Sequence, residues 1–332
     1  MAKFDISSYL SKDALQRLYD KLFKRYQDPD VRSLFAAIGI AVVTYKSAAF
    51  LAALYRNFLR PGYNLIERYG KDSWAVITGA SDGIGKAFAL EFAALGFNIV
   101  LIARNRDKLN SVVDEIKKVR PDTQTRVVVA DFTHSHEEKF YDNISDQIKD
   151  LDVSILVNNV GLFQRLGEFF NLLPPTTIFD IVTVNTAAQT FMTKILLDKM
   201  LNRGGKKAAL LNISSIATDY PFVYNSIYGA TKRYQDVQSR VFQAEFGDKI
   251  DVLNIKPGFV STRMAGYRKP DSVTTDPQTF VRSVIRQIGH EKTTYGHWKH
   301  KYAAFYHSVV PRCLILKKPE PLIGSETQTG GK

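Results

Sequence analysis

The chain has 332 residues with 45 basic and 33 acidic side chains, so its formal net charge is +12. The length suits one large domain with an appendage, and 45% hydrophobic against 23% charged residues exclude a disordered, collagen-like or coiled-coil protein. The single cysteine, Cys313, excludes an intrachain disulfide, and the six histidines lack the spacing of metal ligands. We therefore expect no metal site.

The basic charge leaves three classes of ligand open: nucleic acid, an anionic membrane surface, and a polyanionic cofactor or substrate. No basic run is interleaved with aromatic residues in the manner of RNA-binding segments. We therefore expect no nucleic-acid partner.

Residues 1–30 are predicted to form an amphipathic helix. Between Ser11 and Gln27, apolar residues recur at steps of three and four while charged residues fill the other face. Asp28 and Pro29 are expected to end this helix, because proline cannot continue the backbone hydrogen-bond pattern.

Residues 31–60 are predicted to cross or enter a membrane. The 22-residue stretch from Leu34 to Tyr55 is almost wholly apolar, and as a helix of about 33 Å it would span a hydrocarbon core of about 30 Å. A central lysine, Lys46, opposes insertion by roughly 2.5 to 3.5 kcal/mol. The alternative is a signal-like or buried soluble helix, but no cleavage site of a signal peptide is evident. Residues 61–72 are expected to be a linker.

From Trp74 onward, short apolar runs alternate with helical stretches. This pattern predicts an α/β fold with a doubly wound parallel sheet covered by helices on both faces. The predicted strands are Trp74–Thr78, Asn98–Ala103, Arg126–Ala130, Val153–Asn158, Ala208–Ile213 and Asp251–Ile255. The predicted helices are Ile84–Ala94, Arg106–Lys118, Glu138–Lys149, Ile178–Leu201, Tyr228–Phe246 and Pro277–Gly289.

The first predicted strand runs into a glycine-rich turn and then a helix. Such a turn lets a pyrophosphate approach the backbone, where free N–H groups and the positive end of the helix favour its charge. The position directly after the first core strand favours this reading over an ordinary turn. The residues predicted to bind a dinucleotide here are Gly79, Ser81, Asp82, Gly83, Ile84 and Gly85.

The end of the second predicted strand indicates which dinucleotide is bound. A fold that prefers NAD places a carboxylate there for the adenosine ribose, whereas this chain has Arg104. A guanidinium attracts a 2′-phosphate, and Lys86 could assist. NADP(H) is therefore the expected cofactor, and the alternative is that Arg104 is a solvated residue at a strand end.

Tyr228 and Lys232 open another predicted helix and lie four residues apart on one face. A phenol with a pKa near 10 is a poor acid or base at neutral pH unless its anion is stabilised. We expect Lys232 to lower the pKa of Tyr228. Ser215 ends the fifth predicted strand and should face the same crevice.

Together these residues resemble the short-chain dehydrogenase/reductase superfamily over residues 73 to 300. Thr78 to Gly85 is similar to its TGxxxGxG turn and Asn158 to Gly161 to its NNAG segment. The resemblance implies a Rossmann fold, a catalytic tetrad and a set of cofactor contacts. The implied tetrad is Asn185, Ser215, Tyr228 and Lys232, and the implied cofactor contacts add Asp131, Asn158, Tyr228, Lys232, Pro257, Gly258 and Thr262.

Within that superfamily the chain resembles the membrane-anchored branch of 17-beta-hydroxysteroid dehydrogenases and very-long-chain 3-oxoacyl-CoA reductases. This implies NADPH-dependent reduction of a lipid ketone by hydride transfer, with Tyr228 as general acid and a CoA thioester ahead of a steroid. The alternative is an accessory structural subunit of a larger membrane complex, for example a respiratory one, that keeps the fold and bound NADPH. A homodimer is a further possibility.

The expected organisation is an NADP-binding domain over residues 73–310 and a tail over 311–332. The resemblance favours the endoplasmic reticulum, with the mitochondrial inner membrane as the alternative. The chain ends in Thr329-Gly330-Gly331-Lys332 and lacks the dilysine signal common in that branch.

Overall fold

The computed structural model describes residues 11–164, 169–220, 222–266 and 268–309, and the expected tail at 311–332 lies outside them. The chain divides into two compact units, Met1–Arg60 and Pro61–Lys332.

The described residues of the first unit, from Ser11 on, are almost entirely helical. α1 (Lys12–Tyr26) is capped by Ser11, whose Oγ accepts a hydrogen bond from the amide of Ala14 at 3.2 Å. α2 (Pro29–Leu54) begins two residues after Gln27, and η2 (Tyr55–Leu59) continues it as a π-helical turn. Pro29 therefore separates two helices and also opens the second, where its missing N–H costs nothing.

α2 is exposed along its whole length in this unit. The continuous helix Pro29–Leu59 has 31 residues and is long and apolar enough to cross a membrane by length and composition. It begins before the predicted apolar stretch because Asp28 caps it: Oδ1 of Asp28 accepts a hydrogen bond from the amide of Asp30 at 2.9 Å.

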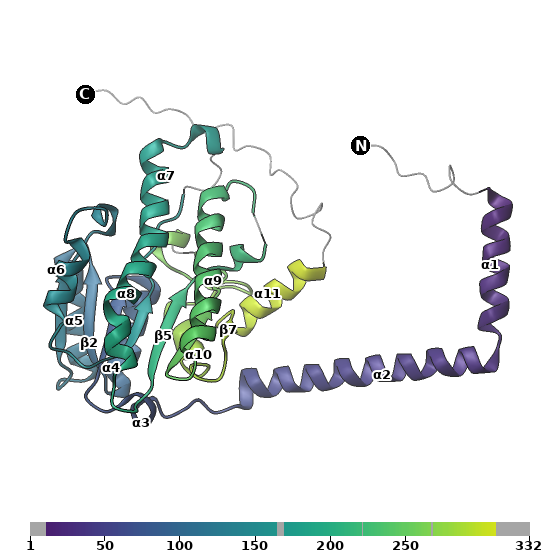
Figure 1. Ribbon diagram of the computed structural model, residues 1–332, viewed down its shortest axis with the longest axis horizontal. Coiled ribbons are helices and arrows are strands. Elements are labelled where there is room, and N and C mark those ends of the chain that lie inside the picture. The colour runs from purple at the N-terminus through teal and green to yellow at the C-terminus, as the bar shows by residue number, and fades with distance from the viewer. Residues whose placement is uncertain (1–10, 165–168, 221, 267, 310–332) are drawn as a thin grey trace. The chain divides into compact units, whose positions relative to one another are not determined.

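The second unit is built on a parallel sheet with the strand order β3-β2-β1-β4-β5-β6-β7 (Figure 1). The order reverses between β1 and β4, as in doubly wound folds. The strands are β1 (Trp74–Thr78), β2 (Asn98–Ala103), β3 (Thr125–Val129), β4 (Val153–Asn158), β5 (Ala208–Ile213), β6 (Ile250–Ile255) and β7 (Thr293–Thr294).

Helices cover both faces of the sheet and bury alternate residues of its central strands. One core includes α4 (Gly83–Leu95), α5 (Arg106–Val119) and α10 (Pro277–Ile285). The other includes α6 (Phe140–Gln147), α8 (Ala188–Leu201) and α9 (Ser226–Phe246). The remaining helices are α3 (Leu65–Tyr69), α7 (Pro175–Val182) and α11 (Trp298–Val309).

The stretch 61–72, expected to be a linker, is part of the folded unit. It contains α3, whose Leu65 and Tyr69 are buried in the core. The hydroxyl of Tyr69 donates to Oδ2 of Asp251 at 2.7 Å, which ties α3 to the start of β6. A helix of five residues is too short to produce a recognisable period.

The predicted helix Ile178–Leu201 is also more complex than expected. It is three consecutive segments: α7, the π-helical turn η5 (Thr183–Ala187) and α8. The π turn inserts one extra residue and contains Asn185. This places a member of the predicted tetrad at the irregular point of the helix.

Candidate active site

The glycine-rich turn lies where β1 meets α4. Gly79 and Gly83 have φ angles of +66° and +57°, which favour glycine. The carboxylate of Asp82 caps α4 by accepting a hydrogen bond from the amide of Gly83 at 2.7 Å. A Cβ on Gly85 would lie 2.3 Å from the carbonyl oxygen of Gly79, so only glycine lets the helix pack this closely on the turn.

Ser81 and Ile84 lie in the same turn and are partly exposed. The N-terminus of α4 directs backbone N–H groups toward this edge, which suits an anion. Thr262 lies beside the turn, because a Cβ on Gly83 would be 2.9 Å from its Cγ2. The structure therefore brings the predicted turn and Thr262 together.

The loop after β4 is tied to the turn by Asn159. Its Nδ2 donates to the carbonyl oxygen of Thr78 at 2.9 Å and to that of Gly79 at 3.3 Å. The hydroxyl of Thr78 accepts hydrogen bonds from the amides of Asn159 and Val160. These bonds fix the loop that carries Gly161.

The side chain of Asn158, a residue predicted to contact the cofactor, is engaged within the fold. Asn158 is buried in β4, and its Nδ2 donates to Thr193 in α8 at 3.0 Å and to Asn212 in β5 at 2.9 Å. Consecutive strand residues point to opposite faces of a sheet, so Asn158 braces the α8 side. Asn159 is the asparagine that contacts the turn.

Arg104 and Asp131 follow β2 and β3 on neighbouring strand ends. Nη1 of Arg104 lies 3.9 Å from Oδ2 of Asp131, and the arginine side chain is 62% exposed. The expected assistance from Lys86 is not seen, because its Nζ donates to Glu115 at 2.8 Å and links α4 to α5. Of the two cations predicted to meet the 2′-phosphate, Arg104 and Lys86, Arg104 therefore remains at this edge.

Ser215 and Tyr228 meet after β5. The hydroxyl of Ser215 caps η6 (Ile216–Thr218) by accepting from the amide of Ala217 at 3.1 Å. Tyr228 lies in the first turn of α9 and is 9% exposed. Burial raises the pKa of Tyr228, and a hydrogen bond with the Ser215 side chain partly opposes that rise.

Lys232 and Asn185 lie beside them. Nζ of Lys232 is 5.6 Å from the centroid of the Tyr228 ring. A Cβ on Gly161 would be 3.2 Å from Oδ1 of Asn185 and 3.4 Å from Nζ of Lys232, so both side chains reach the same loop. The four residues of the predicted tetrad therefore lie at the carboxyl edge of the sheet, next to the loop that contacts the glycine turn.

The charges at this edge differ from the expectation that Lys232 lowers the pKa of Tyr228. Burial lowers the pKa of Lys232 to about 7, and burial is also the main cause of the raised pKa of Tyr228. Desolvation disfavours the ammonium and the phenolate alike. Desolvation therefore sets the direction of both shifts, and Lys232 is not among the causes of the shift of the Tyr228 pKa.

Pro257 and Gly258 form the start of the loop after β6. The carbonyl oxygen of Pro257 accepts a hydrogen bond from the amide of Ile216, next to Ser215, at 2.9 Å. Gly258 lies against His300 of α11, since a Cβ there would be 2.9 Å from the histidine Cδ2. Burial lowers the pKa of His300, so this ring supports the loop as a neutral group near pH 7.

Two buried glutamines were not among the predicted site residues. Oε1 of Gln164 accepts from the amide of Tyr228 at 3.3 Å, and its Nε2 donates to the carbonyl of Tyr224. Oε1 of Gln235 accepts from Nζ of Lys232 at 2.9 Å. The spacing Tyr228, Lys232, Gln235 places the second glutamine on one helix face with the other two, a signal that the sequence carried.

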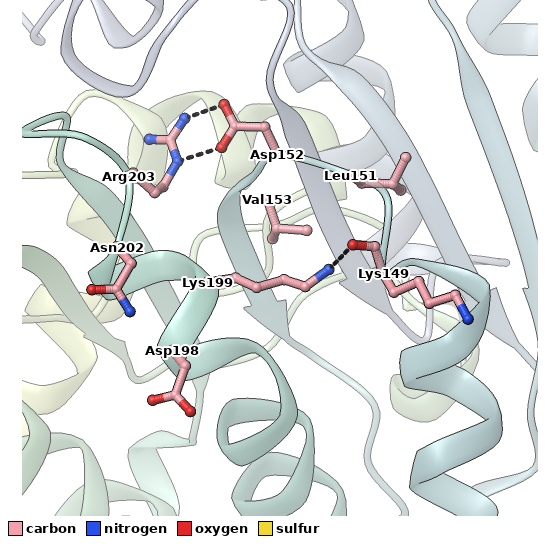
Figure 2. Close-up of a pocket in the computed structure, with 8 residues that line it drawn as sticks. All are labelled: Lys149, Leu151, Asp152, Val153, Asp198, Lys199, Asn202 and Arg203. Carbon is pink, nitrogen blue, oxygen red and sulfur yellow. Dashed lines mark hydrogen bonds and ion pairs between the residues drawn. The ribbon is translucent and has the colours of Figure 1, made fainter.

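An open pocket of about 460 Å³ lies at the opposite edge of the sheet (Figure 2). It is lined by the start of β4 and the end of α8, and Arg203 and Asp152 form two hydrogen bonds of 2.8 Å across it. None of the predicted site residues lines it. Ligands of open α/β sheets bind at the carboxyl ends of the strands, so this pocket is not the candidate active site.

Comparison with known proteins agrees with the geometry of the carboxyl edge. Residues 73–272 match the family model described as short chain dehydrogenase. The chain belongs to the short-chain dehydrogenase/reductase family. It is therefore an oxidoreductase by family, and the nicotinamide cofactor expected from the glycine turn fits this membership. Among the residues that the structure describes, no cluster of histidine, cysteine and carboxylate side chains suits a metal ion.

Two relatives and one solved structure illustrate the similarity. The very-long-chain 3-oxoacyl-CoA reductase of Macaca fascicularis is 38% identical over 251 residues, covering 75% of this chain and 78% of the relative. The inactive hydroxysteroid dehydrogenase-like protein 1 of Homo sapiens is 36% identical, covering 76% of each. A structure from work on 7beta-hydroxysteroid dehydrogenase stereoselectivity has a TM-score of 0.65 at 22% identity, covering 76% of this chain and 98% of that one, and shares the fold.

Proposed function

We propose that this chain is a membrane-anchored, NADPH-dependent reductase that converts a 3-oxoacyl-CoA into the 3-hydroxyacyl-CoA. The observation that carries the proposal is the meeting of Ser215, Tyr228, Lys232 and Asn185 at the carboxyl edge, beside the loop held by the glycine turn. A reductase needs a proton donor close to the nicotinamide, and this edge offers a buried phenol with a hydroxyl and an ammonium as neighbours.

The residues at the turn fit a dinucleotide with a 2′-phosphate. Gly79, Gly83 and Gly85 leave the space for a pyrophosphate to approach the N-terminus of α4. Arg104 is exposed at the end of β2, where a carboxylate would repel the extra phosphate. Asp131 lies close enough to steady the guanidinium and the adenine side of the site. These features favour NADPH over NADH.

The chain's own residues supply the acid. When bound, NADPH supplies the hydride that attacks the ketone carbon. Tyr228 donates its phenolic proton to the carbonyl oxygen as that oxygen gains charge, and Ser215 polarises the same carbonyl with its hydroxyl. The raised pKa of Tyr228 keeps this proton in place at neutral pH. Lys232 is buried, and its pKa of about 7 is close to neutral pH. It returns a proton to the phenolate, and Asn185 lies beside it.

The substrate class follows from charge, from the site wall and from the named relatives. A CoA thioester carries phosphate groups that a chain of net charge +12 attracts. The ring of Phe163 packs on the edge of Tyr228, with centroids 4.8 Å apart, and gives the site an apolar wall suited to an acyl chain. A relative with 38% identity is named a very-long-chain 3-oxoacyl-CoA reductase. A 17-ketosteroid is the second choice.

The anchor fits a substrate that resides in a bilayer. The helix Pro29–Leu59 is exposed and apolar along its length, and we propose that it holds the residues 1–60 unit to the endoplasmic reticulum. The named relatives are a very-long-chain 3-oxoacyl-CoA reductase and an inactive hydroxysteroid dehydrogenase-like protein, and neither name gives support to the mitochondrial alternative.

The second candidate is a non-catalytic subunit of a membrane assembly. It is favoured by the relative named inactive, which is nearly as similar in sequence as the reductase. It requires no aligned phenol, hydroxyl and ammonium, and these are present here. Native purification separates the candidates, because a subunit would co-migrate with a large complex.

A substrate panel tests the proposal. The full chain in detergent is incubated with NADPH and, separately, a long-chain 3-oxoacyl-CoA, the free 3-oxo acid and a 17-ketosteroid, and the products are identified by mass spectrometry. We expect the thioester to be reduced fastest, with NADPH preferred over NADH. No reduction of any ketone by a folded chain that binds NADPH would reject the enzyme in favour of the subunit.

A further inference from the structure

The side-chain amide of Gln235 bridges Lys232 and Asn185. Its Oε1 accepts a hydrogen bond from Nζ of Lys232 at 2.9 Å, and its Nε2 donates to the main-chain carbonyl oxygen of Asn185 at 2.7 Å. The side chain is 1% exposed. An ammonium can only donate and a carbonyl can only accept, so the two partners fix which way the amide points.

The bridge joins two members of the tetrad that come from different helices. Asn185 lies in η5, where the π turn brings its carbonyl toward α9, and its side chain is occupied by Leu162 at 2.7 and 2.9 Å. Lys232 also donates to the carbonyl oxygen of Ile213 at the end of β5, at 2.8 Å. The ammonium is thus held by one carbonyl and one amide, both uncharged.

The charged groups near Lys232 are all committed elsewhere. On its own helix, Asp236 lies one turn further and pairs with Lys256, the residue after β6, at 3.1 Å and with Arg233 at 3.0 Å. After β5, Asp219 pairs with Lys256 at 2.9 Å. Tyr228 is the titratable neighbour on the active-site side. Burial alone accounts for the lowered pKa of Lys232, with no contribution from a charge.

We propose that Gln235 is a positioning residue for the reductase: its amide holds the Lys232 ammonium between Ile213 and Asn185 without a counter-charge and thereby sets the pH at which Lys232 gives up its proton. The inference rests on the proposed function. A carboxylate at this position would retain the proton on Lys232, and an apolar side chain would remove one of its two hydrogen-bond acceptors.

Two variants of similar size shift the proton in opposite directions. Gln235→Glu should raise the pKa of Lys232 and move the alkaline fall of kcat up by about one pH unit, and Gln235→Met should move it down by about one pH unit. Tyr228 remains the acid, so KM for the acyl substrate should change less than about threefold while kcat at neutral pH falls about tenfold in the Met variant. A purely structural role would not move the pH limb in opposite directions.

Gln238 provides the matched control. It lies three residues after Gln235 on the same helix. It also bridges α9 to α8, accepting from Gln189 at 2.9 Å and donating to Thr190 at 3.0 Å. It makes no hydrogen bond to Lys232 among the bonds of the described residues. Gln238→Glu and Gln238→Met should leave the pH limb in its wild-type position. An equal shift in these controls would overturn the proposal, as would superimposable profiles for both Gln235 variants.

A binding measurement separates this inference from the proposed substrate. NADPH affinity is followed by fluorescence titration from pH 6.5 to about pH 9.5, around the pKa range of a buried lysine, with no ketone present. Lys232 is among the cofactor contacts that the family resemblance implies, so the affinity should weaken with rising pH, at higher pH for Gln235→Glu and at lower pH for Gln235→Met. These shifts would support the inference even if no 3-oxoacyl-CoA were reduced. Parallel binding curves for wild type and both variants would contradict it.

Discussion

The two edges of the sheet each bury a cation, and they treat it differently. At the amino edge the side chain of Arg203 is 2% exposed and forms two hydrogen bonds of 2.8 Å with Asp152, which lower the pKa of that carboxyl. At the carboxyl edge Lys232 has only uncharged acceptors, and burial lowers its pKa to about 7. A cation with a counter-charge is fixed, whereas one without it can exchange a proton near neutral pH.

The carboxyl edge contains both kinds of cation side by side. Lys256 is 2% exposed and Lys232 is 3% exposed. Nζ of Lys256, however, contacts Asp219 at 2.9 Å and Asp236 at 3.1 Å. Lys256 directly precedes Pro257, so its ion pairs hold the loop after β6 against η6 and α9. Burial alone therefore does not identify the group suited to proton transfer. Lys232 is identified by its lack of a counter-charge.

The largest expected effect is the loss of the proton donor. Tyr228→Phe removes the hydroxyl and keeps the ring, so we expect kcat to fall at least about a hundredfold, the lower end for a lost general acid. Ring packing on Phe163 should survive, and NADPH affinity should change little. Steady-state kinetics and fluorescence titration measure both. A variant that reduces substrate at the wild-type rate would end the catalytic role of Tyr228.

The amino edge should affect stability and leave chemistry unchanged. Arg203→Met leaves Asp152 without its guanidinium partner. It removes three hydrogen bonds, two to Asp152 and one to the carbonyl of Lys207. We expect the free energy of unfolding to fall by about 2 kcal/mol. Denaturant unfolding measures the loss, and kcat of the folded variant should stay within about twofold. A large fall in kcat with unchanged stability would mean that the pocket in Figure 2 belongs to the active site.

The cofactor preference should depend on one exposed arginine. Arg104→Ala should raise KM for NADPH about tenfold, since an exposed charge-assisted bond to phosphate is lost, and leave KM for NADH unchanged. Arg106→Ala, two residues along at the start of α5, is the control. If both substitutions weaken NADPH equally, the effect comes from general positive charge and not from a 2′-phosphate contact.

The smallest expected effect is a change of the free energy of unfolding with pH. Lys232 has a pKa of about 7 in the folded chain against 10.5 as an ordinary lysine, so between these values the unfolded chain holds a proton that the folded chain has lost. Raising the pH through this window therefore favours the folded state, by at most about 1.4 kcal/mol per pH unit. Denaturant unfolding of wild type and Lys232→Met should diverge in this direction above pH 7. A difference that is constant with pH would show that Lys232 keeps its charge when buried.

The sequence predicted the sheet well because buried parallel strands produce continuous apolar runs. β1, β2, β4 and β5 begin and end at the predicted residues. β3 is shifted by one residue at both ends, and β6 begins one residue earlier than predicted. β7 has two residues and α3 has five, which is too few to show a period. α11 was not predicted. Its exposed face carries the aromatic residues Tyr302, Phe305 and Tyr306, so the helix lacks the division into an apolar and a polar face.

Site residues were predictable where a motif fixed them and less so where packing decides. The motif Asn158-Asn159 does not tell which amide turns to the glycine turn, and the strand pleat assigns that contact to Asn159. The directions in which the pKa values of Lys232 and Tyr228 shift depend on burial, which a four-residue spacing does not reveal. Gln235 could have been found, since it shares the helix face of Tyr228 and Lys232.

The central claim is that hydride passes from NADPH to the ketone of a 3-oxoacyl-CoA at the carboxyl edge of the sheet. The most direct measurement uses NADPH with deuterium at the transferable position of the nicotinamide and follows the product by mass spectrometry. We predict a 3-hydroxyacyl-CoA that carries one deuterium on the carbinol carbon, formed by the wild-type chain and at least about a hundredfold more slowly by Tyr228→Phe. A product without deuterium, or no product from a chain that binds NADPH, would contradict the account.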